Sequence, residues 1–280
     1  MPLGLTENLF QRIVAALVLL PPVVWLIYSG GMWFTGLLMA GGIVMVMEWH
    51  HMTRVRPKLI QFSSMAFVLS ACLFGHLITP QTPVAMILLA MAIPLLLVIT
   101  ALGDLDEDKS PILHIMRWSG NGTLYVALPL MSLAWIRGIG QGFLFVLWTF
   151  LIVWAADVGG YFFGKGLGGP KLAPSISPKK TWAGFMGGII LAAAVTFAMV
   201  KILSAYDLGD YDMILAVSTA SMLAIVSQVG DLFESAIKRA FKVKDSGQLI
   251  PGHGGILDRV DGLVFVAPTM AALLDIYVAN

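Results

Sequence analysis

The sequence predicts an all-α polytopic membrane protein. Of its 280 residues, 58% are hydrophobic and only 12% are charged, and the mean hydropathy is +0.87. Soluble domains contain roughly 25% charged residues. The apolar residues also form runs long enough to cross a bilayer, and short polar or glycine- and proline-rich segments separate these runs. The net charge of +1 gives no indication of nucleic acid as a partner, so we expect the lipid bilayer to surround the chain.

Nine apolar runs predict about nine transmembrane helices. The expected ranges are 10–28, 32–49, 59–78, 83–102, 121–139, 142–162, 182–201, 212–231 and 262–279. The first run lacks a small-residue cleavage site and leads directly into the second, so we expect an uncleaved membrane helix. About five helices make up residues 1–140. About four make up a catalytic part, residues 141–280, with cytoplasmic loops at 164–181 and 232–261.

The distribution of basic residues predicts the orientation. With the N-terminus in the cytoplasm, 15 of the 17 lysines and arginines fall on the cytoplasmic side, and only Arg137 and Lys201 fall outside. Positive charge is retained on the cytoplasmic side of a membrane. Because the number of helices is odd, the C-terminus is expected on the outer side.

Four aspartates come together at the cytoplasmic side in this topology. Asp157 lies towards the inner end of the sixth helix, Asp231 at the inner end of the eighth, and Asp258 and Asp261 at the start of the ninth. Ionisable groups bordering membrane helices usually face a cavity or a partner, because lipid exposure costs about 2.5–3.5 kcal/mol or more. Carboxylates from different elements, with phosphate oxygens and waters, commonly hold Mg²⁺ at phosphoryl-transfer sites. A set of salt bridges is the alternative interpretation.

A first basic segment, residues 175–182, precedes the seventh helix. Ser177 is placed to cap this helix and Pro178 suits its first position, so free N–H groups would point into the cytoplasmic mouth. Together with Lys179 and Lys180, these groups would favour an anion. A well-capped helix with a basic flank is the alternative for the same residues.

A second charged segment, residues 235–261, interrupts the apolar sequence. It has acids and bases on both sides of a glycine-rich centre, where His253 is placed to contact a phosphate or to act as an acid. Ser235 and Lys238 lie four and seven residues after Asp231. They would therefore share one helix face with it if the eighth helix continues past the membrane.

These residues resemble the signature of the phosphatidate cytidylyltransferases, also called CDP-diacylglycerol synthases. The resemblance is carried by SAIKR at 235–239, KDSG at 244–247 and PGHGGILDRVD at 251–261. Gly230-Asp231 and the SPKKTW segment at 177–182 are similar to that family as well. The first 140 residues match it only in hydropathy, and DVGGY at 157–161 departs from the family's more usual Thr-Gly-Ala between the acid and the tyrosine.

The resemblance implies that CTP and phosphatidic acid react to give CDP-diacylglycerol and pyrophosphate, with Mg²⁺ as cofactor. It implies Asp231 and Asp258 as metal ligands, supported by Asp261 and Asp157. It also implies a bacterial cytoplasmic (inner) membrane, with the active site facing the cytoplasm. Catalytic roles are expected for Asp231, Asp258, Asp261, Lys238 and His253, and substrate binding is expected for Ser175, Ser177, Lys179, Lys180, Ser235, Arg239, Lys244 and Arg259.

Other functions stay open at this point. A CTP-dependent kinase, or a cytidylyltransferase acting on another membrane lipid, would use much of the same chemistry. A secondary transporter could also place carboxylates in a helical bundle, although the sequence has no convincing inverted repeat and its charges gather at one face rather than at the midplane. The oligomeric state is open too, with a homodimer as one option.

Overall fold

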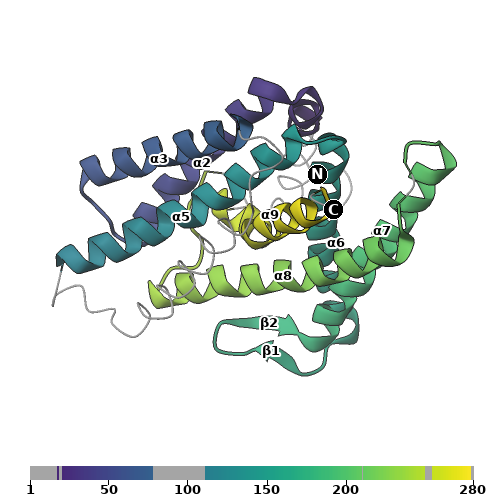
Figure 1. The fold of residues 1–280 in the computed structure, drawn as a ribbon. Coiled ribbons are helices and arrows are strands. Elements are labelled where there is room, and N and C mark those ends of the chain that lie inside the picture. The colour runs from purple at the N-terminus through teal and green to yellow at the C-terminus, as the bar shows by residue number, and fades with distance from the viewer. Residues whose placement is uncertain (1–17, 19–20, 78–110, 210, 250–253, 279–280) are drawn as a thin grey trace.

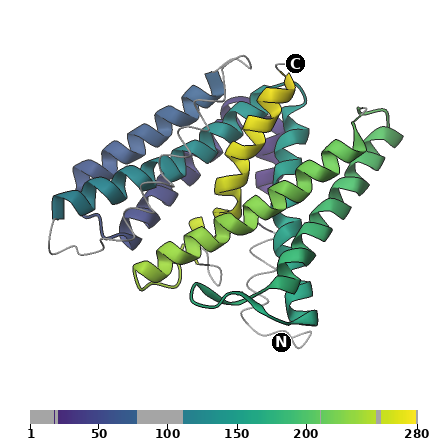
Figure 2. The same cartoon turned by 60° about the horizontal axis from the view of Figure 1, so that its bottom comes forward.

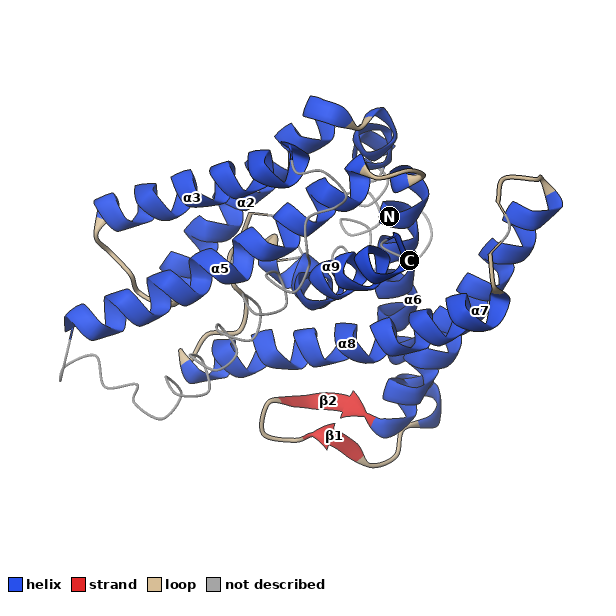
Figure 3. Ribbon diagram, viewed as in Figure 1, coloured by secondary structure: helices blue, strands red, loops and turns tan. Residues whose placement is uncertain are grey.

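The computed structural model of the chain describes residues 18, 21–77, 111–209, 211–249 and 254–278, and they are mostly helical (Figures 1 and 3). A helical segment at 21–29 precedes the labelled elements. These are α2 (Gly31–Met52), α3 (Lys58–Leu77), α5 (Pro111–Gly138), α6 (Gly142–Leu167), β1 (Lys171–Ala173), β2 (Ser177–Thr181), α7 (Trp182–Ala205), α8 (Met213–Ala240) and α9 (Leu257–Val278).

The described part contains five helices long and apolar enough to cross a membrane, namely α2, α3, α6, α7 and α8. Large apolar side chains on their outer surfaces are exposed, among them Trp33, Phe62 and Ile190. A soluble protein rarely exposes so much apolar surface, whereas lipid covers it at no cost. An all-α membrane protein is therefore the fold class in broad outline. The predicted helix at 83–102 lies outside the described residues.

Helix α9 lies between two groups of helices. It packs against α5, which lies beside α2 and α3, and against α8, which packs on α7 (Figures 1 and 2). Buried residues from both groups form one apolar core, which includes Trp49, Trp118 and Met270. Trp49 also donates a hydrogen bond from Nε1 to the carbonyl oxygen of Trp118 at 2.7 Å. The centre of the bundle thus holds α9, whose first two turns carry two of the predicted site aspartates.

Four helices extend at least five residues further than their apolar runs predict, and one of them, α6, ends at Leu167 instead of 162. Helix α8 continues to Ala240 instead of ending near 231, α5 begins at Pro111 instead of 121, and α9 begins at Leu257 instead of 262. The predicted loop at 232–261 is therefore shortened to 241–256. An apolar run stops where charged residues begin, but a helix can continue with its polar face turned to a partner. Here Lys238 pairs with Glu234 one turn earlier, which stabilises the added turns of α8.

The predicted loop at 164–181 folds into the last turn of α6 and an antiparallel hairpin, so the all-α prediction missed a small sheet. In the hairpin, Lys171 lies opposite Thr181 and Ala173 lies opposite Ser177. The prediction that Ser177 caps the seventh helix is wrong, because Ser177 and Pro178 belong to β2. The cap is Thr181, whose Oγ1 accepts a hydrogen bond from the N–H group of Gly184 at 3.1 Å.

Helices α6 and α7 approach each other backbone to backbone. A Cβ atom added at Gly184 would lie 2.6 Å from the carbonyl oxygen of Gly160, and one added at Gly159 would overlap the backbone of Gly187. Small residues permit such close packing between membrane helices. The contact places the inner end of α6, with Asp157, next to the hairpin and the start of α7.

Candidate functional site

A cavity of about 470 Å³ lies among the C-terminal parts of α6 and α8, the N-terminal parts of α7 and α9, and the two strands. All four predicted aspartates line it, together with four of the six predicted lysines and arginines. These residues are Asp157, Asp231, Asp258, Asp261, Lys179, Lys180, Lys238 and Arg259. The structure thus brings together side chains that lie up to about a hundred residues apart in the sequence.

Close packing of α8 against α9 sets the position of two of these aspartates. A Cβ atom added at Gly230 would lie 2.7 Å from the carbonyl oxygen of Asp261, and one added at Gly262 would overlap the hydroxyl of Ser227. Only residues without a side chain allow this approach. Asp231 is the sequence neighbour of Gly230 and Asp261 that of Gly262, so the close contact brings these two aspartates near each other on neighbouring helices.

Asp231 carries the one described ion pair between the hairpin and the helices. Its Oδ2 lies 2.5 Å from Nζ of Lys180, and both side chains are partly exposed. Its Oδ1 accepts a hydrogen bond from the hydroxyl of Ser235 at 3.3 Å, as the shared helix face predicted. Lys180 pairs with only one of the carboxylates that line the cavity, and Asp157 and Asp261 form no ion pair with another described residue.

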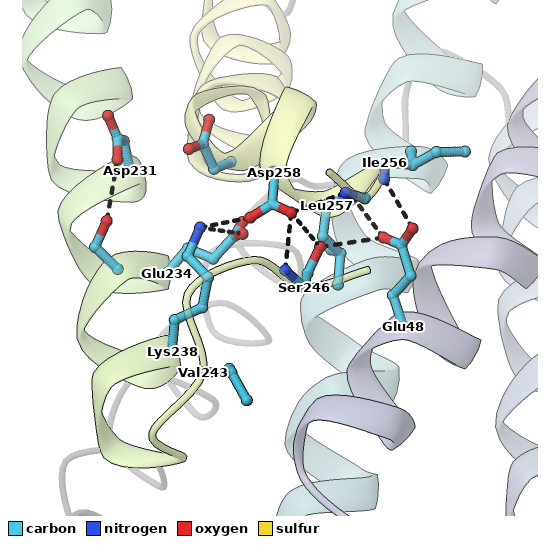
Figure 4. Close-up of polar contacts among 12 residues, drawn as sticks. Glu48, Asp231, Glu234, Lys238, Val243, Ser246, Ile256, Leu257 and Asp258 are labelled. Carbon is cyan, nitrogen blue, oxygen red and sulfur yellow. Dashed lines mark hydrogen bonds and ion pairs between the residues drawn. The ribbon is translucent and has the colours of Figure 1, made fainter. Parts of the chain in front are cut away.

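Asp258 is buried and anchored by four donors (Figure 4). Its Oδ2 accepts hydrogen bonds from the N–H and hydroxyl groups of Ser246, both at 2.8 Å, and from the N–H of Gly255 at 2.9 Å. Its Oδ1 accepts one from Nζ of Lys238 at 2.7 Å. Burial alone would raise the pKa of Asp258, which lies before the predicted span of α9. The hydrogen bond from Lys238 and those from the backbone outweigh burial, so the pKa is lowered and the group stays ionised.

Lys238 lies between two buried carboxylates. Besides Asp258, its ammonium group contacts Oε1 of Glu234 at 3.1 Å, and Glu234 is fully buried. Two negative charges thus surround one positive charge. We conclude that Lys238 organises the floor of the cavity in this structure, and that its charge is already neutralised by the protein.

Comparison with known proteins identifies the family. Residues 10–277 match the model of the cytidylyltransferase family. The chain belongs to the cytidylyltransferase family. A phosphatidate cytidylyltransferase of Brucella suis biovar 1 (strain 1330) is 38% identical over 265 residues, which cover 93% of this chain and 91% of the relative. One of Rickettsia bellii (strain RML369-C) is 34% identical over 212 residues, covering 73% and 90% of the two chains. One of Staphylococcus aureus (strain COL) is 43% identical over 159 residues, covering 53% and 58%.

Four other predicted residues that the structure describes do not line the cavity. Arg239 donates hydrogen bonds to the backbone carbonyls of Ile176 and Val243, so it ties α8 to the hairpin and to the following loop. Lys244 lines a separate cavity of about 1330 Å³ beside α2. Ser175 is exposed in the turn between β1 and β2, Ser177 lies in β2 itself, and neither lines the site. His253 lies outside the described residues.

Glu48 and Ser246 belong to the surroundings of the cytidylyltransferase site and were not predicted. Glu48 comes from α2, in the first 140 residues. These residues were expected to match the family only in hydropathy, but the family model and the Brucella suis relative align with this half as well. Glu48 contacts Ser246 and the start of α9. One signal could have revealed it. A carboxylate near the end of an otherwise apolar membrane helix requires a partner.

The residues of the cavity fit a magnesium ion, although no three acidic, histidine or cysteine side chains of the described residues converge as a ready metal site. Mg²⁺ usually takes one or two carboxylates and completes its shell with substrate phosphates and waters. Asp157, Asp231 and Asp261 line the cavity with more negative charge than Lys180 balances. Asp258 can contribute only Oδ1, because Oδ2 already accepts three hydrogen bonds.

Proposed function

We propose that the chain is a phosphatidate cytidylyltransferase, which transfers a cytidylyl group from CTP to phosphatidic acid and releases pyrophosphate. One observation carries the proposal. Aspartates of α6, α8 and α9 converge in one cavity with cationic side chains of β2, α8 and α9, where a lipid phosphate and a water-soluble nucleotide can meet. The relative of 38% identity, which bears this enzyme's name, aligns with 93% of the chain.

The reaction requires little covalent chemistry from the protein. An oxygen of the lipid phosphate attacks the α-phosphorus of CTP and forms the new P–O bond, while the bond from that phosphorus to the bridging oxygen breaks and pyrophosphate leaves. The lipid supplies the nucleophile, so no serine or cysteine nucleophile is needed. Positioning of the two phosphates and neutralisation of their charge account for such a step.

Each group of cavity residues has a role in this proposal. Lys179, Lys180 and Arg259 line the cavity and bind phosphate oxygens, whereas Lys238 and Ser235 hold Asp258 and Asp231. Mg²⁺ would take one or two of its ligands from Asp157, Asp231, Asp261 and Oδ1 of Asp258 and the others from phosphate oxygens and waters, and when bound it supplies positive charge to the phosphates. Substrate binding by Ser175, Ser177, Arg239 and Lys244, and a catalytic role for His253, stay predictions.

Apolar side chains beside the cavity support a lipid as one substrate. Tyr161 and Phe185 line the cavity from α6 and α7. Tyr161, Phe162 and Trp182 nearby are at least half exposed. A polar cavity with an exposed aromatic edge suits a molecule with a phosphate at one end and acyl chains at the other. We therefore place lipid entry at the side of α6 and α7.

The proposal includes nine spans, a cytoplasmic N-terminus, an outer C-terminus and an active site that faces the cytoplasm. The charge distribution along the sequence supports this topology, and the relatives named above are bacterial. The bacterial cytoplasmic membrane is therefore the proposed location. A homodimer stays a prediction without further support.

A reaction assay tests the proposal. The purified chain in detergent micelles is incubated with CTP, phosphatidic acid and Mg²⁺, and the lipid product is identified by mass spectrometry. We expect CDP-diacylglycerol and an equal amount of pyrophosphate, with loss of the reaction in EDTA and recovery when Mg²⁺ is added back. A CTP-dependent lipid kinase would give CDP and a phosphorylated lipid instead. A transporter would give solute uptake into liposomes without nucleotide.

A further inference from the structure

Glu48 is a buried carboxylate that the reaction described above does not use. It lies in the last turns of α2, only 7% of its surface is exposed, and it does not line the transferase cavity. No lysine or arginine of the described part forms an ion pair with it at hydrogen-bonding distance. A buried charge is costly unless other groups satisfy it, so its partners indicate what it does.

Two of those partners are the first backbone N–H groups of α9. Oε1 accepts a hydrogen bond from the N–H of Ile256 at 2.9 Å, and Oε2 accepts one from the N–H of Leu257 at 2.9 Å (Figure 4). The first N–H groups of a helix lack partners within the helix, and its N-terminus carries partial positive charge. Glu48 therefore caps the N-terminus of α9, although it belongs to a helix more than two hundred residues earlier in the sequence.

Ser246 connects Glu48 with Asp258. The hydroxyl of Ser246 lies 3.3 Å from Oε2 of Glu48 and 2.8 Å from Oδ2 of Asp258, and its N–H group donates to the same Oδ2 at 2.8 Å. One hydroxyl proton serves only one acceptor at a time. The N–H group holds Asp258 in either case, so the three residues form a continuous contact from α2 to the cavity floor.

Two glycines of the charged segment leave room for Glu48. A Cβ atom added at Gly247 would lie 2.7 Å from Oε1 of Glu48, and one added at Gly255 would lie 2.6 Å from its Cδ atom. Contacts this short would force the carboxylate or the loop to move. The glycines therefore let the backbone at 246–247 and 254–255 close around this one side chain.

We propose that Glu48 is a positioning residue of the transferase site, holding the start of α9 and thereby Asp258 in place. The inference rests on the proposed function, because the position of Asp258 matters only if the cavity performs the transfer. Glu48 touches neither substrate nor reacting atoms. It acts through the backbone of residues 255–257 and through Ser246.

The test is the variant Glu48→Gln, which keeps the size of the side chain but leaves one acceptor oxygen for two N–H donors. We expect kcat for CDP-diacylglycerol formation to fall roughly 10- to 100-fold, because small displacements of a site residue can cost this much, while KM for CTP changes less than about threefold. Hydrogen exchange should accelerate in peptides that cover 254–258 and stay unchanged in α6 and α7. Glu48→Asp, which keeps the charge but shortens the reach, should give an intermediate kcat.

Thr35→Val serves as the matched control. Thr35 is equally buried in α2, but its hydroxyl bonds only to the carbonyl of Gly31 within the same helix. We expect its kcat and its exchange at 254–258 to equal those of the wild type. In the double variant Glu48→Gln with Ser246→Ala, the combined loss should be smaller than the product of the two single losses, because the two residues act through one contact.

Several results would overturn the positioning role. These are wild-type kcat in Glu48→Gln, fast exchange throughout the protein, or losses that multiply in the double variant. A variant that cannot be recovered folded would also show a purely structural role, provided that Glu48→Asp then has wild-type kcat. If the wild type forms no CDP-diacylglycerol, the proposed function fails. The exchange at 254–258 still decides whether Glu48 holds the start of α9.

Discussion

Lys180 of β2 and Asp231 of α8 form an ion pair across the mouth of the cavity, with 2.5 Å between Nζ and Oδ2. The pair joins the hairpin to a helix that follows it by some thirty residues. Both side chains are partly exposed, although Nζ of Lys180 is itself buried in the pair, and a phosphate that approaches Lys180 also approaches the carboxylates. The contact explains why a basic strand lies over an acidic cavity before any nucleotide is bound.

Lys180→Ala should weaken the use of CTP. The change removes a cation from a mouth where carboxylates already outnumber it, so repulsion of the triphosphate increases. We expect kcat/KM for CTP to fall roughly 10- to 100-fold, equivalent to about 1.5–3 kcal/mol. Lys179→Ala provides the comparison, since Lys179 lines the same cavity, forms no ion pair with another described residue and should give a smaller loss. Equal kinetics for wild type and Lys180→Ala would remove Lys180 from the substrate site.

Asp258→Asn should abolish most of the turnover. The substitution removes the charge that three N–H or O–H donors and Lys238 stabilise, and it turns an amide donor towards some of those donors. We expect pyrophosphate release to fall by about 100-fold or more. The control is Asp212→Asn at the N-cap of α8, far from the cavity, because asparagine caps a helix about as well as aspartate. Turnover near the wild-type rate in Asp258→Asn would exclude a role for this charge.

Thr181→Ala should lower stability. It removes the hydroxyl that accepts the N–H group of Gly184 at the start of α7. The expected loss is about 1 kcal/mol in the free energy of unfolding, seen as a lower melting temperature in detergent. Thr181→Ser keeps the acceptor and should melt close to the wild type. Ser177→Ala should also change little, and a larger loss there than in Thr181→Ala would contradict the assignment of the cap.

Gly184→Ala should disturb the contact between α6 and α7. Its Cβ atom would meet the carbonyl of Gly160 at 2.6 Å, so the two helices must separate. We expect a destabilisation of about 1–3 kcal/mol, typical of overpacking, together with reduced turnover because Asp157 and β2 move apart. Gly36→Ala is the control, since Gly36 is exposed on α2 with no atom within 4 Å of the added methyl. Equal melting temperatures of Gly184→Ala and Gly36→Ala would show that stability does not depend on the close contact between α6 and α7.

The sequence predicted the membrane fold and the residues of the cavity better than it predicted the local structure around them. Hydropathy identified each of the described helices, because long apolar runs have few alternatives in a membrane. It could not place the ends of α5, α8 and α9, where polar faces are satisfied by tertiary partners rather than by water. Lys238 is one example, since it was expected on the helix face of Asp231 only if the eighth helix continues past the membrane, and its ion pair with Glu234 lies in those added turns.

The hairpin and Glu48 were missed for a different reason. Strand β2 contains Pro178 and two lysines, which are residues uncommon in strands, and only its pairing with β1 and its contact with α8 fix its conformation. Glu48 is separated from its partners by about two hundred residues. Local patterns carry no information about such a contact, although an acid near the end of an apolar helix indicates that one exists.

The capping of α9 by α2 has a consequence for any attempt to divide the chain at residue 140. A fragment of residues 141–280 would contain the whole transferase cavity, yet the first N–H groups of its last helix would lose the carboxylate that accepts their hydrogen bonds. The two halves should therefore melt in a single cooperative transition. A truncated enzyme should regain order in residues 254–258 only when the missing half is supplied as a separate polypeptide.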